Sequence, residues 1–220
     1  MTERSKRPYD AARAKSAILA AAEQLFAEHG YSAARIDAIA SASGYNKSLI
    51  YQYYQDKLGL YVAVIQRADQ LGNEAFNAVV AEMLADAEVT RSPEKFKRFL
   101  EAVLKTSYRF MNENPNYVKI FAWEAAEEWK TWKQISYAMD EFTPFYELAH
   151  EAKKNKIIRQ DIEPIMIPIL FMNSVIPFLQ SFKRLEGITN DRLKAGMDSQ
   201  QFVEQIVKLV IYGVMEPSLL

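Results

Sequence analysis

Residues 30–60 read GYSAARIDAIASASGYNKSLIYQYYQDKLGL and hold two short apolar patterns. The first pattern, Ile36–Ala40, ends before Gly44, and glycine is a common helix stop. Asn46 follows at the position of an N-cap, because its side-chain oxygen can accept a free backbone N–H of the next helix. That second helix is short and runs to Tyr54. The spacing therefore predicts two short helices joined by a tight turn.

A longer amphipathic helix precedes this pair. Apolar residues recur at intervals of three and four between about Ala11 and Glu28, and Gly30 follows as a stop signal. Three helices in so short a stretch suit a helix-turn-helix, whose last helix lays its outer side into the major groove of DNA. Three packed helices without a DNA role give the same spacing, so periodicity alone leaves both alternatives open.

The outer side of the second short helix carries groups that hydrogen-bond base edges and phosphates. Leu49 or Ile50 would face the core together with Tyr54. The opposite side then offers a cation, two hydroxyls and an amide, from Lys47, Ser48, Tyr51 and Gln52. Lys57 begins the next helix, where a positive side chain and free backbone N–H groups favour a phosphate. Taken singly, each of these residues could equally pack or be solvated.

A longer pattern resembles the N-terminal domain of the TetR family of transcriptional regulators. It covers residues 15–62 and consists of Ile18, Ala21-Ala22, Leu25-Phe26, Gly30-Tyr31, Ile39-Ala40, Gly44, Leu49-Ile50-Tyr51, Tyr53-Tyr54, Lys57 and Leu60. The resemblance implies a DNA-binding domain in residues 1–60, with a flexible basic arm over 1–12. It also implies a larger ligand-binding and dimerisation domain in residues 61–220.

The same resemblance implies which residues contact DNA. Tyr51 and Lys57 stand where the family clamps phosphates. The full set that we expect at the DNA is Arg35, Tyr45, Asn46, Lys47, Ser48, Leu49, Tyr51, Gln52 and Lys57. Leu49 replaces a small polar residue that is common in the family, and an apolar side chain there favours a thymine methyl group.

Two departures from the family pattern affect the expected contact with a DNA phosphate and the stability of the helix that contains Gly59. The second helix of the family commonly starts with Thr or Ser, whereas this chain has Ala34 and Arg35. We expect Arg35 to replace the phosphate contact by charge and Asp37 to add a capping carboxylate. Gly59 replaces a charged residue and is expected to weaken the next helix by up to ~1 kcal/mol.

Periodicity along the rest of the chain predicts an all-α fold of about nine helices, three of them short and near the start. Residues 129–154 are expected to form one helix, kinked near Pro144. Residues 164–182 carry no formal charge, yet three prolines and four polar side chains interrupt them, which favours a buried helix over a membrane span. The last helix carries an apolar stripe from Phe202 to Val214.

Composition narrows the chemistry further. The chain has 220 residues, a net charge of −1, two histidines and no cysteine. Disulfides, thiolate nucleophiles and cysteine-bound zinc are therefore excluded. Common hydrolase, nucleotide-binding and zinc-protease motifs are absent, and Glu124, Glu127 and Glu128 are interpreted as a solvated helix face. We expect no enzyme activity, no cofactor and no metal, in a cytoplasmic protein that does not bind a membrane.

The charge is unevenly distributed. Residues 1–60 carry eight basic and six acidic side chains, and the remaining 160 residues carry 19 basic and 22 acidic ones. Arg4, Lys6, Arg7 and Arg13 make the leading arm basic, which suits a polyanion at this end of the chain. A solvated tail explains the same charges.

By resemblance, we expect a homodimer that pairs its last two helices, an operator of double-stranded DNA, and a small organic effector. The alternative is that both helices only fill the core of one chain. Apolar and aromatic residues of the second domain are candidates for the effector pocket: Ser107, Phe110, Met111, Trp123, Trp132, Met139, Phe142, Phe171, Asn173 and Phe178. Each of them could instead be ordinary core. The resemblance favours a repressor that its effector releases from DNA, and the competing hypothesis is a helical carrier without a DNA role.

Overall fold

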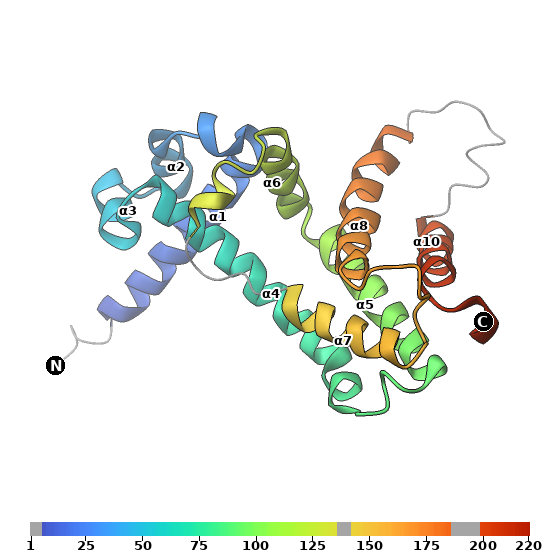
Figure 1. The fold of residues 1–220 in the computed structure, drawn as a ribbon. Helices are drawn as coiled ribbons and strands as arrows, with labels where there is room; N and C mark the ends of the chain where they lie inside the picture. Colours follow the sequence, from blue (N-terminus) through green and yellow to red (C-terminus); the bar gives the residue numbers. More distant parts are fainter. Residues whose placement is uncertain (1–5, 136–141, 186–198) are drawn as a thin grey trace. The chain divides into compact units, whose positions relative to one another are not determined.

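The computed structural model describes residues 6–135, 142–185 and 199–220. Over these residues it consists of nine α-helices and two short 3-10 helices, with no strand beyond an isolated bridge between Ile158 and Met215. The α-helices, shown in Figure 1, are α1 (Lys6–Ala33), α2 (Ile36–Ser43), α3 (Lys47–Tyr54), α4 (Lys57–Ala85), α5 (Pro93–Glu113), α6 (Pro115–Ala126), α7 (Phe142–Lys154), α8 (Met166–Leu185) and α10 (Ser199–Val214). The 3-10 helices are η1 (Trp132–Gln134) and η2 (Pro217–Leu219). The expected all-α fold is confirmed.

The chain divides into two compact units. The first comprises the described residues of Met1–Leu71 and Asn114–Ser136, and the second those of Gly72–Glu113 and Tyr137–Leu220. We call them the head unit and the body unit. The head unit is discontinuous in sequence because α6 packs against α1. The division of functions at residue 60 stays a prediction.

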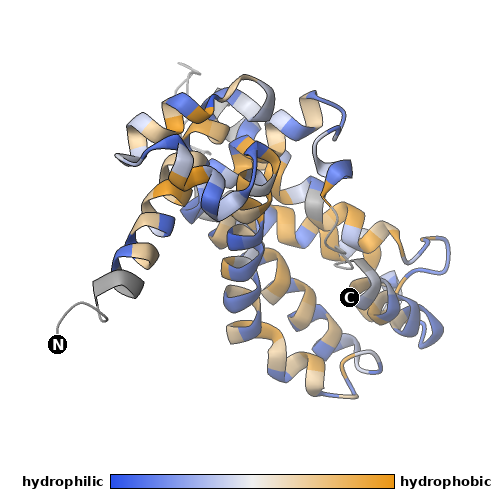
Figure 2. Cartoon of the chain, turned by 90° about the vertical axis from the view of Figure 1, so that its left-hand side faces the viewer, coloured by the Kyte–Doolittle hydropathy of each residue, from blue (hydrophilic) through white to orange (hydrophobic). Residues whose placement is uncertain are grey.

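The helices of the head unit pack around a small apolar core. Ile18 and Phe26 of α1, Ile39 of α2, Ile50 of α3 and Leu60 of α4 are all completely buried. Each of these helices has an apolar side and a polar side, as Figure 2 shows by the alternation of orange and blue along the ribbons. Burial of the apolar sides fixes which side of α3 remains exposed.

The body unit has a core of its own. Phe96, Phe99 and Leu100 of α5 are buried, and they belong to a cluster that includes Phe171 of α8 and Ile211 of α10. Helix α5 packs against both α8 and α10, and α7 packs against α8.

The start of α1 and its break differ in detail from the expectation. Helix α1 begins at Lys6, so residues 6–12 of the expected arm lie in its first turns, while residues 1–5 lie outside the described residues. The stop at Gly30 is confirmed, because Gly30 has φ 72° and ψ 171° and interrupts the helical backbone before the last residues of α1.

The single helix expected over residues 129–154 is wrong. Glu128 and Trp129 have φ values of 58° and 60°, and these left-handed conformations end the helical path after α6. The short helix η1 follows, residues 136–141 lie outside the described part, and α7 begins at Phe142. Pro144 lies in the first turn of α7, where proline is tolerated.

The junction between α3 and α4 explains the unusual Gly59. Asp56 caps α4 as expected, since its Oδ1 accepts a hydrogen bond of 2.7 Å from the Gly59 N–H. Gln55 has a φ of 68°, and the carbonyl oxygen of Tyr54 lies beside Gly59. A Cβ at this position would lie 2.0 Å from that oxygen. Glycine is thus required by the close approach of the backbone.

We predict that Gly59→Ala lowers the free energy of unfolding by about 2 kcal/mol, because the new methyl group overlaps a backbone atom. Gly72→Ala is the matched control, since it makes the same change in the same helix and its Cβ would lie 3.6 Å from the Phe110 ring. Its better helix propensity should stabilise the protein by up to ~1 kcal/mol. Urea unfolding monitored by circular dichroism measures both, and equal effects would contradict this account of Gly59.

Candidate nucleic-acid interface

The turn between α2 and α3 is fixed by local hydrogen bonds. Gly44 ends α2 with φ 75° and ψ 14°, and its N–H donates to the Ala40 carbonyl over 3.1 Å. Asn46 then caps α3, because its Oδ1 accepts a hydrogen bond of 2.9 Å from the Leu49 N–H. The predicted stop and N-cap are both confirmed. Together they set the direction in which α3 leaves the turn.

Helix α3 has one buried and one exposed side. Ile50 is completely buried, and Leu49 is half-buried. Tyr51 is 45% exposed even though it is aromatic. Exposed side chains on α3 and at its start are Asn46, Lys47, Ser48, Tyr51 and Gln52. The outward orientation predicted for Lys47, Ser48, Tyr51 and Gln52 is confirmed, and the contact of all five residues with DNA stays a prediction.

Charged groups lie at the starts of α2 and α3. Lys47 forms an ion pair with Asp37, which lies in the first turn of α2. Arg35 is exposed and occupies the N-cap position of α2, where it makes no side-chain cap. The carboxylate of Asp37 pairs with Lys47 from the neighbouring helix, and its expected capping role stays a prediction.

Tyr54 fastens α3 to α1. Its hydroxyl donates a hydrogen bond of 3.2 Å to the Lys15 carbonyl, and the Lys15 ammonium lies 5.1 Å from the centre of the Tyr53 ring. Burial raises the pKa of Tyr54 to about 12, because the charged phenolate would lose its hydration. Tyr54 therefore faces inward, as predicted, and remains neutral at physiological pH.

Lys57, the first residue of α4, is held by two contacts. Its ammonium donates a hydrogen bond of 3.2 Å to the Ser32 carbonyl and lies 4.6 Å from the centre of the Tyr31 ring. Burial lowers the pKa of Lys57, and the negative charge of Glu127 opposes that shift. Its proposed phosphate contact would therefore come from a half-buried side chain of fixed direction.

Sequence reasoning missed the role of α6 in the head unit. Glu124 was interpreted as part of a solvated face, yet it is only 2% exposed. Its Oε1 accepts a hydrogen bond of 2.6 Å from the Tyr61 hydroxyl, and its Oε2 accepts one of 3.0 Å from the Trp132 N–H. The signal was present in the spacing, because Tyr117 and Ile120 precede Glu124 on the same buried side of α6.

Further contacts join α6 to α1. Glu23 of α1 accepts hydrogen bonds from the Asn116 amide over 3.0 Å and from the Tyr117 hydroxyl over 3.1 Å. The Trp123 indole N–H donates to the Ala27 carbonyl over 3.2 Å, and its ring covers Gly30. Helix α6 is thus a structural part of the head unit.

The residues predicted for an effector pocket are distributed over both units. Trp123 and Trp132 belong to the head unit, where Trp132 packs on Phe121 and Trp129. Met139 lies outside the described residues, and Phe142 begins α7. Phe142 belongs to the body unit, and so do the other six residues: Ser107, Phe110, Met111, Phe171, Asn173 and Phe178. Their role in binding an effector stays a prediction.

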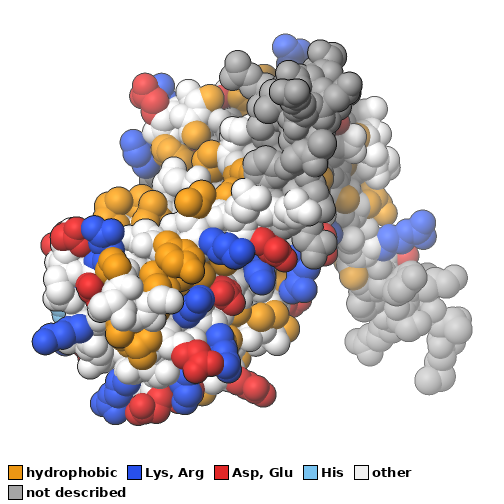
Figure 3. Space-filling model, turned by 90° about the vertical axis from the view of Figure 1, so that its right-hand side faces the viewer, with side chains coloured by type: hydrophobic (Ala, Val, Ile, Leu, Met, Phe, Trp, Pro, Cys, Tyr) orange, Lys and Arg blue, Asp and Glu red, His pale blue; other side chains and the backbone are white. Residues whose placement is uncertain are grey.

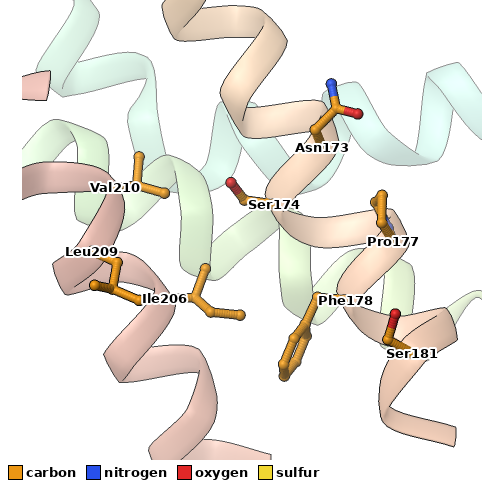
Figure 4. Close-up of a pocket in the computed structure, with 8 residues that line it drawn as sticks. All are labelled: Asn173, Ser174, Pro177, Phe178, Ser181, Ile206, Leu209 and Val210. Carbon is orange, nitrogen blue, oxygen red and sulfur yellow. The ribbon is translucent and has the colours of Figure 1, made fainter. Parts of the chain in front are cut away.

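Two of those six, Asn173 and Phe178, line a groove between α8 and α10. The groove has a volume of about 400 Å³. Figure 4 shows its walls, with residues of the two helices facing each other: Asn173, Ser174, Pro177, Phe178 and Ser181 from α8, and Ile206, Leu209 and Val210 from α10. Phe110 and Phe171 are instead buried, and Phe171 belongs to the core cluster of the body unit.

Two kinds of site are missing from the part of the chain that the structure describes. No group of three or more histidine, aspartate or glutamate side chains there is arranged to hold a metal ion. None of the described helices is long and apolar enough to cross a membrane.

Comparison with known proteins matches part of the head unit to a known family. Residues 18–64 match the model of the bacterial regulatory proteins of the tetR family. Residues 18–64 form a TetR-family domain. This domain contains α2, α3 and the start of α4, and the helix-turn-helix predicted from the sequence lies within it.

Curated relatives match over part of the chain. The transcriptional activator FasR of Mycolicibacterium smegmatis is 35% identical over 98 residues, which is 44% of this chain and 44% of that protein. The transcriptional repressor BepR of Brucella suis is 39% identical over 59 residues, or 27% of this chain and 28% of that protein. The matches thus span less than half the length of these relatives.

Solved structures match the fold over nearly the whole chain. The hemolysin II transcriptional regulator HlyIIR has a TM-score of 0.61 at 19% identity, and the match covers 94% of this chain and 99% of that one. A TetR-like regulator from Rhodococcus sp. RHA1 has a TM-score of 0.58 at 20% identity, with 91% and 94% covered. The chain therefore has a fold similar to that of these two structures.

Proposed function

We propose that this protein is a transcriptional regulator of the TetR type, which binds operator DNA as a homodimer and is released by a small organic effector. The observation that carries the proposal is the exposed side of α3 within a TetR-family domain. There a cation, two hydroxyls and an amide face outward while Ile50 anchors the helix in the core. Such a helix can enter a major groove without unfolding any part of the head unit.

The proposed DNA contacts divide into two kinds. Base edges are read by groups near the middle of α3, chiefly Ser48 and Gln52, whose hydroxyl and amide can pair with several bases. Leu49 offers the exposed part of its side chain to a thymine methyl group. Phosphates are bound around the rim of this surface by cations, hydroxyls and the amide of Asn46, and the residues are Arg35, Tyr45, Asn46, Lys47, Tyr51 and Lys57.

The apolar surface of α8 and α10 supports dimerisation through these two helices. Leu209 is 73% exposed and Tyr212 is 54% exposed, which is unusual for large apolar side chains. Figure 3 shows apolar side chains gathered among charged ones on the side of the molecule drawn there. A second copy packed on α8 and α10 would cover such side chains and close the groove of Figure 4. A symmetric dimer then presents two α3 helices to two half-sites.

The effector is proposed to be apolar or aromatic. Tyr108, Met111 and Phe178 of the body unit are half-buried beside its core and could rearrange around a ligand. The effector would favour a dimer whose two α3 helices no longer match the operator, so we place the protein among repressors. The curated relatives include an activator as well as repressors. The protein is proposed to act without catalysing a reaction.

We predict that the purified protein binds a duplex from upstream of its own coding region more tightly than a random duplex. Lys47→Ala should weaken this binding about tenfold and reduce the steepness of its salt dependence by about one phosphate contact. Tyr51→Phe should weaken it less, because only a hydroxyl is lost. Lys105→Ala is the matched control, since it removes the same charge from an exposed position on α5. Electrophoretic shifts at several salt concentrations provide the measurement.

If that duplex is not the operator, genomic fragments captured by the protein and sequenced will identify it. DNA recognition would be contradicted if the protein preferred no captured fragment and if Lys47→Ala bound DNA as weakly as the wild-type protein. That result would favour a helical carrier.

We predict that the protein sediments as a dimer at micromolar concentration and that Leu209→Glu makes it a monomer. The reason is that a charge at the centre of an apolar interface would be buried without a partner. Leu84→Glu introduces the same charge at another exposed leucine, on α4, and should leave the dimer intact. A monomeric wild-type protein, or a dimer that survives Leu209→Glu, would contradict the proposed interface.

We predict that the low-molecular-weight fraction of a cell extract releases the protein from its operator. Linkage requires that the operator weaken effector binding by the same factor, because both ligands compete through one equilibrium. Electrophoretic shifts of the operator duplex, with and without the extract fraction, measure the release directly. In a promoter reporter, transcription should fall when the protein is added. Transcription that rises on binding would identify an activator.

A further inference from the structure

We propose that the C-terminal end of α6 positions Lys57 for the DNA backbone, through Glu124 and Glu127. This inference rests on the proposed DNA-binding function. It adds two acidic residues from outside the helix-turn-helix to the machinery that prepares a phosphate contact. Two separate series of contacts, both inside the head unit, connect these residues to the Lys57 ammonium.

The first series runs through aromatic rings. Glu124 is buried and accepts a hydrogen bond of 2.6 Å from the hydroxyl of Tyr61, which is itself only 1% exposed. The Tyr61 ring packs edge-on against Tyr31, with 5.1 Å between the ring centres. The Tyr31 ring in turn supports the Lys57 ammonium at 4.6 Å. Glu124 thus fixes the position of Tyr61, and Tyr61 limits where the ring beneath Lys57 can lie.

The second series runs through Ser32. Its hydroxyl donates a hydrogen bond of 3.0 Å to Oε2 of Glu127, which follows the last residue of α6. The carbonyl of the same serine accepts the hydrogen bond of 3.2 Å from Lys57. A single residue therefore contacts both the acidic end of α6 and the Lys57 side chain.

Both series restrict the conformational freedom of the Lys57 side chain. A lysine side chain has several rotatable bonds, and a contact with DNA normally costs the entropy of ordering them. Here that ordering has already taken place in the free protein. The ammonium has three donor positions, of which the Ser32 carbonyl takes one and the ring face engages another, so donor capacity remains for a phosphate oxygen.

The chain offers a matched control for the first series. Tyr61 and Tyr117 are both buried, and each donates its hydroxyl to a glutamate and so joins α6 to another helix of the head unit. Tyr61 packs against the ring under Lys57, whereas the hydroxyl of Tyr117 reaches Glu23 on α1. Changing either tyrosine to phenylalanine removes one tyrosine–glutamate hydrogen bond and keeps the ring; the bond of Tyr61 is buried and that of Tyr117 is part-buried. The Tyr61 series alone leads to Lys57 through the contacts described above.

The test is a double-mutant cycle on the full-length protein with its captured operator duplex. Tyr61→Phe should weaken operator binding about fivefold, while Tyr117→Phe changes it by less than about twofold. In the background of Lys57→Gln, Tyr61→Phe should have no further effect, because the side chain that it acts through has gone. Tyr61→Phe should also reduce the salt dependence toward that of Lys57→Gln. Melting temperatures of all variants show whether the two tyrosine changes destabilise the fold to similar degrees.

Ser32→Ala tests the second series without disturbing a buried group, because Ser32 is exposed. It removes the hydroxyl that contacts Glu127 and retains the carbonyl that holds Lys57. Operator binding should weaken about twofold, again only while Lys57 is present. This variant keeps the inference testable if Tyr61→Phe does not fold.

The inference is overturned if Tyr61→Phe and Ser32→Ala each weaken operator binding by the same factor in the wild-type and Lys57→Gln backgrounds, since they would then act through general stability. It is also overturned if Lys57→Gln leaves operator binding unchanged while Lys47→Ala reduces it, and in that case the proposed function stands. A wild-type protein that prefers no duplex removes both proposals.

Discussion

The carboxyl group of Glu124 is buried among the helices of the head unit, and a polar group in such a place must find hydrogen-bond partners. It finds them in the Tyr61 hydroxyl and the Trp132 backbone N–H, which come from α4 and from the start of η1. A displacement of α6 would leave these buried donors and acceptors unpaired at considerable cost. The arrangement of α6 against α4 therefore depends on this group, and with it the surroundings of Tyr31 and Lys57.

The exposed side of α3 follows from similar constraints on the opposite side of the same unit. Ile50 and Tyr54 fix the inner side of the helix by apolar burial and by one hydrogen bond to α1. Asn46 fixes its start. The side chains that remain outside need no internal partner except Lys47, which pairs with Asp37. A short helix can thus present polar groups in a fixed direction because its other side is fully committed to packing.

Local features of the head unit could be predicted from the sequence, whereas features that depend on distant residues could not. Gly44, Asn46 and Asp56 act on neighbours within four residues, and their roles as stop and caps are confirmed. The spacing of Tyr117 and Ile120 marked the side of α6 that carries Glu124 as buried, but its partner Tyr61 lies far away in the chain and could not be predicted. The helix expected over residues 129–154 failed because Glu128 and Trp129 adopt left-handed backbone conformations, which no glycine or proline announces. Likewise, the requirement for Gly59 depends on where the Tyr54 carbonyl lies.

The groove between α8 and α10 combines residues that the sequence marked, Asn173 and Phe178, with others visible only once the helices are packed.

The head unit consists of two separate segments of the chain, and this limits how its helices can be transferred to another protein. Gly30 has a positive φ, and the Trp123 ring covers the space beside it, so the end of α1 is shaped to receive a residue from a distant part of the chain. A fragment that stops within α4 would expose this surface and leave Tyr61 without its acceptor. Transplanting α1 to α3 onto another body would therefore require the segment from Asn114 onward to travel with them, as two pieces of one graft.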